Sequence, residues 1–250
     1  MKIFLSFLIS LTLLVPATSI PAESNFSVRT DDYYVISSVQ NNLVLDISGG
    51  SNEDNTPVIL WSSHGGPNQL WKFAPISERG YYNVISRKND KCLDIANANS
   101  DTFYLVIKTK SNVDSQKWKI TLTDTNGIQI ISKVNGYVIS RKNASNEQGV
   151  EVIVSRNTNS ASQKWRLKSL QSIEAFKEAE KLYIQAEALY YKEKYNEALV
   201  LYQKAVQLAP DYGDAIRDIE LIYEKFKKYN EALEILLKAA MLIPDDPWVY

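Results

Sequence analysis

The sequence predicts a multidomain protein, with an all-β domain of three similar lobes followed by an all-α array of helix-turn-helix repeats. Two repeat systems predict this division. A Gln-x-Trp triplet occurs three times at intervals of 47 residues, and the hexapeptide "KYNEAL" occurs twice, 34 residues apart, near the C-terminus. The charge balance changes between them: residues 25–168 carry 17 Lys/Arg against 13 Asp/Glu, and residues 169–250 carry 10 against 15. These observations predict two domains that differ in fold.

The first 23 residues have the features of a signal peptide. Lys2 supplies a positive start, residues 3–15 form a short apolar run, and "ATS" at 17–19 offers small residues for cleavage. A transmembrane helix needs about 20 apolar residues, and this run is shorter. We therefore expect an exported protein, secreted or periplasmic, without a stable membrane anchor; an uncleaved anchor is the alternative.

Cysteine, histidine and charge content exclude several classes of site. Cys92 is the single cysteine and His64 the single histidine, so an intrachain disulfide and a Cys/His metal site are excluded. The formal net charge of -1 argues against a nucleic-acid binder, which normally has a basic excess. We expect no cofactor and no metal.

The segments around the triplets predict regular short strands. "YYVISSVQNNLVLDIS", "YYNVISRKNDKCLDIA" and "IQIISKVNGYVISRK" each read as two strands about a polar turn. Then come the apolar, β-branched runs "TPVILW", "FYLVIK" and "GVEVIVS". Short strands at regular spacing are typical of a closed or sandwiched all-β domain, and three copies indicate pseudo-threefold symmetry.

With these motifs, residues 31–168 resemble a ricin B-type lectin, a β-trefoil whose lobes each carry one Gln-x-Trp. The resemblance implies that the triplet tryptophans pack in the core. The structural triplets are Gln69/Trp71, Gln116/Trp118 and Gln163/Trp165. Cys92 aligns with Val44, so we expect it to be a buried free thiol.

Residues 172–250 resemble tetratricopeptide (TPR) repeats, with two antiparallel helices per 34 residues. Pro210 and Pro244 share the offset of the "KYNEAL" copies. We expect full repeats at 179–212 and 213–246 and a third that begins at 247, with 171–180 as a linker merging into the first helix. Asp211 is placed to cap the third helix, and Glu220 departs from the small residue that the family prefers. The expected packing positions are Leu182, Ala186, Leu189, Ala198, Tyr202 and Ala205, then Ile216, Ile219, Tyr223, Ala232, Leu236 and Ala239.

A comparison of the three lobes, aligned on their triplets, isolates one set of polar and aromatic residues. The first lobe has Asp46, Trp61 and Asn68, the second has Asp94, Lys108 and Ser115, and the third has Ser140, Ser155 and Ser162. Val58 and Leu60 correspond to apolar residues in all lobes, so strand alternation directs Trp61 to the opposite, outer face. In the alternative reading, the Trp61 ring folds onto the loop "SSHGG".

Sugar binding uses residues of these types. A carboxylate accepts a pair of hydroxyls in charge-assisted bonds, and an amide both donates and accepts. The resemblance implies that Asp46 takes the hydroxyl pair of the sugar, Trp61 stacks on its apolar face and Asn68 contacts a further hydroxyl. Gln69 would support Asp46 or merely hold the turn, and His64 would reach the ligand from the loop or simply be solvated. The family often binds galactose-type sugars, but Ile59 replaces a frequent polar residue, which leaves the sugar open.

Concave TPR surfaces usually bind peptides or proteins, and by repeat position Tyr183, Glu187, Tyr190 and Tyr191 would line or flank that groove. The sequence therefore predicts an exported carbohydrate-binding protein with a single sugar site and a helical module for protein–protein interaction. The partner on the helical module stays unknown. No catalytic set is evident, so we expect no enzyme activity. The alternative is a non-catalytic scaffold, or the accessory arm of a larger secreted enzyme such as a glycoside hydrolase.

Overall fold

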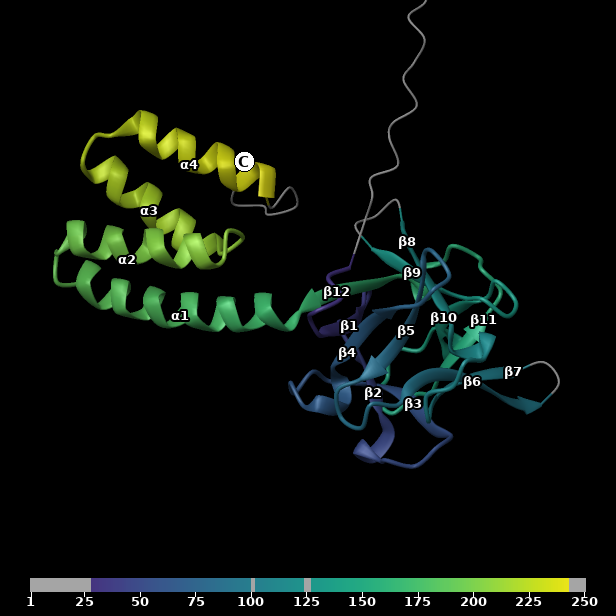
Figure 1. The fold of residues 1–250 in the computed structure, drawn as a ribbon. Helices are drawn as coiled ribbons and strands as arrows, with labels where there is room; N and C mark the ends of the chain where they lie inside the picture. The colour runs from purple at the N-terminus through teal and green to yellow at the C-terminus, as the bar shows by residue number, and fades with distance from the viewer. Residues whose placement is uncertain (1–27, 100–101, 124–126, 243–250) are drawn as a thin grey trace, which may run out of the picture.

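The computed structural model describes residues 28–99, 102–123 and 127–242. The expected signal peptide at 1–23, Pro244 and the expected third repeat from 247 lie outside the described residues. Within them, twelve β-strands form one part of the molecule and four α-helices form the other (Figure 1). This confirms the expected order of an all-β domain followed by an all-α repeat region. No helix in these ranges is long and apolar enough to cross a membrane.

Six strands, two from each lobe, close into a barrel. Antiparallel pairing runs around the ring in the order β1, β4, β5, β8, β9, β12 and back to β1. Closure leaves no exposed edge in this ring. The strands are β1 (Tyr34–Ser38), β4 (Trp71–Pro75), β5 (Tyr81–Ser86), β8 (Trp118–Leu122), β9 (Ile128–Ser132) and β12 (Trp165–Ser169).

Three hairpins, one from each lobe, cover one end of the barrel. Each pairs antiparallel within its own lobe, and β7 also pairs with β3 and with β11, which joins the lobes. Barrel and hairpins together make a β-trefoil. The hairpins are β2 (Val44–Ile47) with β3 (Thr56–Trp61), β6 (Cys92–Asn99) with β7 (Thr102–Lys108), and β10 (Val138–Arg141) with β11 (Val152–Ser155).

The three triplet tryptophans lie in the core of the trefoil, completely buried. Trp71 donates its indole N–H to the carbonyl of Leu45 at 3.2 Å. Trp118 and Trp165 make the equivalent bonds in their lobes, at 3.1 and 3.0 Å. A buried indole N–H needs such an acceptor, so each ring is fixed both by packing and by one directional bond to the hairpin above it.

The triplet glutamines brace the loop that precedes each triplet. In every lobe the side-chain amide donates to a backbone carbonyl seven residues earlier, at 2.7–3.0 Å, and its oxygen accepts from a backbone N–H five residues earlier. A buried glutamine is thereby satisfied by otherwise unpaired backbone groups. The carbonyls belong to Ser62, Thr109 and Arg156, and the N–H groups to His64, Ser111 and Thr158.

Strand β12 runs directly into helix α1 (Leu170–Tyr190), as Figure 1 shows. The Ser169 hydroxyl accepts the N–H of Ser172 at 3.0 Å, which caps the helix at its first turn. The expectation of a linker at 171–180 is wrong, because this whole segment is helical. Leu170 and Ile173 pack against a small apolar cluster on the trefoil, formed by Val35, Val44 and Leu70.

The other helices are α2 (Tyr195–Leu208), α3 (Gly213–Lys225) and α4 (Tyr229–Leu242). One buried cluster of the helices contains five of the expected packing positions, Ala186, Ala198, Tyr202, Ala205 and Ile219. Ile216 and Ala232 are also buried, and Leu182, Leu189 and Tyr223 pack against the cluster partly buried. The side chains of Leu236 and Ala239 lie outside the described part. The expectation that Asp211 caps the third helix is wrong: α3 is preceded by Tyr212, which makes no side-chain cap.

Glu220 is a charged residue on the packed side of α3. Its side chain is half-buried. Burial and the neighbouring charge of Glu224 raise the pKa of this carboxyl above its ordinary value. The glutamate at a position where the family prefers a small residue therefore puts a partly desolvated charge on α3.

Candidate functional site

The register of β2 and β3 places the two key residues of the first lobe on one face. Asp46 lies opposite Ile59, and Val44 lies opposite Trp61. Side chains directly opposite each other, and those two apart on a strand, point to the same side of a sheet. Asp46, Ile59 and Trp61 therefore share the outer face, while Leu45 and Leu60 point into the core.

Asp46 is a nearly buried carboxylate, 4% exposed, held by two side-chain amides. Asn68 donates to Oδ1 at 2.8 Å, and Gln69 donates to Oδ2 at 2.6 Å. Burying a charge is costly unless hydrogen bonds compensate it, and here both oxygens are compensated. Each oxygen keeps a further lone pair, so Asp46 can still accept hydrogen bonds from a ligand.

Gln69 is one of the triplet glutamines that brace the loops of the trefoil, and it also holds Asp46 in the site. The same Nε2 that donates to Asp46 also donates to the Ser62 carbonyl at 2.9 Å. Its Oε1 accepts the backbone N–H of His64 at 2.8 Å. The two roles considered for Gln69, supporting Asp46 and holding the turn, are therefore made by one side chain.

His64 is turned toward the carboxylate rather than away from it. Its Nδ1 accepts the N–H of Gly66 at 3.1 Å, and its Nε2 lies 3.4 Å from Asp46 Oδ2. An accepting Nδ1 means that the neutral ring carries its proton on Nε2, which faces Asp46. The ring is half-exposed and lies at the rim of the cluster.

Trp61 is the most exposed tryptophan of the described residues, at 41%. A carbon added at Gly149 would lie 3.6 Å from its Cζ3, so one edge of the ring lies beside the third lobe. The amide of Gln148 also donates to the Ser62 hydroxyl at 2.8 Å. An exposed aromatic ring next to a hydrogen-bonded carboxylate is an arrangement that can hold a ligand with both an apolar face and hydroxyl groups.

The second and third lobes lack this combination. Gln116 donates to Asp94 at 3.0 Å, as Gln69 does to Asp46, but Lys108 and Ser115 stand where the first lobe has Trp61 and Asn68. In the third lobe, Gln163 donates to the hydroxyl of Ser155 instead of to a carboxylate. The triplet glutamine thus braces its loop in all three lobes, whereas Asp, Trp and Asn occur together at the site positions in the first lobe alone.

Ser62, Gln148 and Gly149 adjoin the cluster, and sequence comparison of the lobes does not predict them. The last two reach it because the third lobe folds back onto the first, and the spacing of the triplets carries no signal for that contact. In the ranges that the structure describes, no group of three or more His, Cys, Asp or Glu side chains is arranged to hold a metal ion.

The residues expected in the helical groove are partly packed. The Tyr183 hydroxyl donates to Asp218 on α3 at 3.0 Å, and its ring contacts those of Tyr202 and Tyr212. Glu187 and Tyr190 are half-buried, and Tyr191 is exposed. Tyr183 thus joins the two repeats, because it links α1 to α3.

The fold and the repeated triplets define a protein of the β-trefoil lectin class with a helical repeat region. The ricin-type beta-trefoil lectin domain matches residues 32–165, and the chain belongs to that family. The tetratricopeptide repeat matches residues 189–250. The lectin domain belongs to a carbohydrate-binding class.

Known structures share the trefoil part. The designed threefold-symmetric protein ThreeFoil is 29% identical with a TM-score of 0.53, over 55% of this chain and 99% of that one. The Rhizoctonia solani agglutinin is 21% identical with a TM-score of 0.52, over 58% of this chain and 98% of that one. Flavastacin from Elizabethkingia meningoseptica is 33% identical over 94 residues, which are 37% of this chain and 21% of that protein. The chain therefore spans about a fifth of the length of that relative.

Proposed function

We propose that this protein is an exported lectin that binds a glycan at one site in its first lobe. The observation that carries the proposal is the Asp46–Asn68–Gln69 cluster beside the exposed ring of Trp61, a set that the other two lobes lack. Asp46 accepts vicinal hydroxyls, Trp61 stacks on the apolar face of the sugar, and Asn68 contacts a further hydroxyl. His64 lies at the rim of the site, with its Nε2 turned toward Asp46.

A galactose-type sugar is the first candidate ligand. A Macrolepiota procera ricin B-like lectin, 21% identical with a TM-score of 0.50, has been solved in complex with lactose. In this chain Ile59 lies opposite Asp46, so the floor between Asp46 and Trp61 is apolar. Such a floor suits the C–H face of a hexose.

The test is titration calorimetry of the full chain with galactose, lactose and a small panel of neutral glycans. Asp46→Asn and Trp61→Ala are expected to lower affinity at least about tenfold, because each removes a central contact. Asp94→Asn and Lys108→Ala make matched changes in the second lobe and should leave the affinity unchanged, with one sugar bound per chain. Equal losses from changes in both lobes would refute a single first-lobe site.

The helical module is proposed to bind a protein or peptide. Tyr229, Leu233 and Leu237 form an exposed apolar stripe on α4, at positions four residues apart. Proteins that bind the wild-type chain should no longer bind the Leu233→Asp variant. They should still bind the Leu122→Asp variant, which makes the same change at an exposed leucine of the trefoil. Equal protein binding by both variants would show that this face of α4 is not the binding surface.

A second candidate function is that of a non-catalytic arm of a larger secreted protein. The match to flavastacin covers 21% of that protein, and the likeness to the exo-β-1,3-galactanase 1,3Gal43A of Clostridium thermocellum covers 31% of that chain. Trefoils of this kind therefore occur within longer chains. The mass of the native product, detected with an antibody to residues 28–242, distinguishes the candidates, and N-terminal sequencing of exported material tests cleavage near residue 23.

A further inference from the structure

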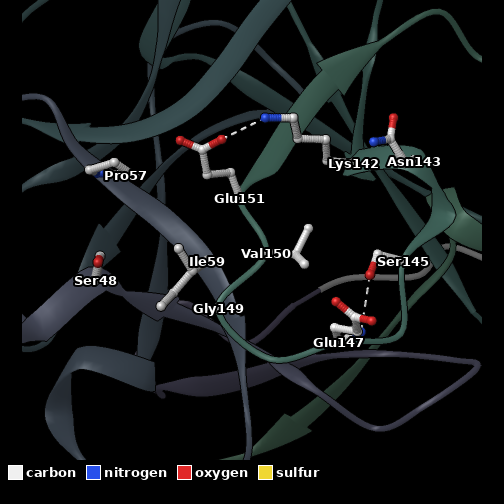
Figure 2. A pocket seen from close by; sticks show the side chains of 10 residues that line it. All are labelled: Ser48, Pro57, Ile59, Lys142, Asn143, Ser145, Glu147, Gly149, Val150 and Glu151. Carbon is white, nitrogen blue, oxygen red and sulfur yellow. Dashed lines mark hydrogen bonds and ion pairs between the residues drawn. The ribbon is translucent and has the colours of Figure 1, made fainter.

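An open cleft of about 780 Å³ lies where the third lobe meets the first. Its size falls within the range of about 300–1,000 Å³ that is usual for small-molecule sites. Figure 2 shows Ile59 and Val150 in its middle, the Lys142–Glu151 pair toward one end and Ser145 with Glu147 toward the other.

The cleft is continuous with the first-lobe site. Ile59 lines it and lies opposite Asp46, two residues before Trp61 on the same outer face. Gly149 also lines it and lies beside the Trp61 ring. A sugar stacked on Trp61 with its hydroxyls at Asp46 would therefore have the cleft next to it.

Backbone pairing holds the two walls of the cleft together. Leu60 donates its N–H to the Val150 carbonyl, and Gly149 donates to the Leu60 carbonyl, both at 2.8 Å. Ile59 and Glu151 form a β-bridge, which places their side chains on the same face. Residues 149–151 of the third lobe are thus paired with β3 by one bridge and two backbone hydrogen bonds. A site whose walls are already held in this way costs little ordering entropy when a ligand binds.

A buried arginine anchors the loop that carries the outer wall. The Arg141 guanidinium donates from Nη1 to the Ser145 carbonyl at 2.7 Å and to Asn146 Oδ1 at 2.5 Å. Its Nη2 donates to Gln40 of the first lobe. These bonds tie the loop at 142–151 to both lobes.

The lining has the chemistry of a sugar subsite. Pro57, Ile59 and Val150 supply an apolar surface, while Ser48, Asn143 and Ser145 supply hydroxyl and amide groups. Lys142 Nζ lies 2.7 Å from Glu151 Oε2, so those two charges compensate each other. The exposed Glu147 carboxylate makes no ion pair with any described residue, which leaves the cleft with one negative charge.

We propose that this cleft is a second subsite that receives the next sugar unit of a neutral oligosaccharide whose first unit binds at Trp61 and Asp46. Asn143 and Glu147 hydrogen-bond that second unit. The negative charge of Glu147 disfavours acidic sugar units. The subsite rests on the proposed lectin function and extends its ligand from a monosaccharide to a glycan of at least two units.

The variants follow from the loop geometry. Asn143 has a φ of +54°, and the equivalent position of the first lobe is Gly49 at +62°, so Asn143→Gly removes the amide without backbone strain. Glu147→Gln removes the charge at an exposed position. Glu174→Gln makes the same chemical change at an exposed site on α1 and serves as the control.

The experiment measures the affinity of the full chain for methyl galactoside, for galactose-terminated β1,3- and β1,4-linked neutral disaccharides, and for sialyllactose. At least one neutral disaccharide should bind more tightly than the monosaccharide. Asn143→Gly and Glu147→Gln should each reduce that advantage roughly three- to tenfold, the effect of one hydrogen bond, with unchanged affinity for methyl galactoside. Glu147→Lys should improve sialyllactose binding, and Glu174→Gln should change nothing.

The outcomes separate the two proposals. Trp61-dependent binding of methyl galactoside with no disaccharide advantage, or with an advantage that all cleft variants retain, overturns the subsite and leaves the lectin function intact. Failure of every probe to bind at high millimolar concentration overturns both.

Discussion

Gln69 donates a 2.6 Å hydrogen bond to Asp46. This bond connects one of the three triplet glutamines, which brace the same loop in every lobe, to a carboxylate of the site that occurs in the first lobe. The same amide holds the Ser62 carbonyl, and the same side chain accepts from the His64 N–H. Gln163 makes the equivalent backbone bonds in the third lobe, where a serine hydroxyl replaces the carboxylate.

This relationship predicts different results for two equivalent substitutions. Gln69→Ala and Gln163→Ala should each lower the free energy of unfolding by about 1–3 kcal/mol, because each leaves buried backbone groups unpaired. Only Gln69→Ala should also weaken sugar binding, since it frees Asp46. Urea unfolding and calorimetry on both variants measure the two effects. Equal losses of sugar affinity would show that Gln69 acts only through overall stability.

His64 offers a direct test of the site geometry. Its Nδ1 accepts from the Gly66 N–H, so the neutral ring should be the Nε2–H tautomer with that proton toward Asp46. The chain has one histidine, so two-dimensional ¹⁵N correlation spectra of the ring need no assignment. At a pH where the ring is neutral, a protonated Nδ1 would contradict this arrangement of the loop. Asp46→Asn should shift the Nε2 resonance.

Cys92 should be inert in the folded protein. It is completely buried, as its alignment with Val44 predicts, and burial raises the pKa of its thiol to about 11. Since the thiolate is the reactive form, a disulfide reagent such as dithionitrobenzoate should titrate no thiol at pH 8 in buffer and one thiol per chain in denaturant. Rapid reaction of the native protein would mean that β6 opens readily.

The trefoil could be predicted because the same residue types pack in the same way in each of its lobes. Trp71, Trp118 and Trp165 each need a core position and a carbonyl acceptor, and that requirement produces an evenly spaced motif in the sequence. The helical repeats could be predicted for a similar reason, since close helix contact demands small residues at fixed intervals, as at Ala198 and Ala205.

Features that depend on contacts between units could not be predicted. The polar composition of residues 171–180 resembles a linker, but it belongs to the exposed side of α1, and Ser169 caps that helix directly after β12. The approach of Gly149 to Trp61 depends on how the third lobe closes against the first. Asp46, Asn68 and Gln69 do lie together as lobe comparison indicates, and their role in sugar binding stays a prediction.

Glu220 should make the helical region less stable than it can be. Its folded-state pKa lies above the ordinary value through burial and through Glu224, so the carboxylate destabilises the fold where it is charged, above that pKa. As the pH falls through the folded pKa the group takes up a proton and the penalty disappears. Glu220→Ala should therefore raise the free energy of unfolding at pH 7, by roughly 0.5–1 kcal/mol because solvent screens the charge of a half-buried carboxylate.

The matched control is Glu180→Ala, at an exposed glutamate inside α1 where the substitution makes the same gain in helix propensity. Urea unfolding followed by far-ultraviolet circular dichroism should show the larger gain for Glu220→Ala at pH 7. The difference between the variants should shrink at about pH 4, near the ordinary pKa of glutamate, because Glu220 is then protonated in the folded state. A difference that is equal at both pH values would assign the gain to packing of the smaller side chain rather than to the charge.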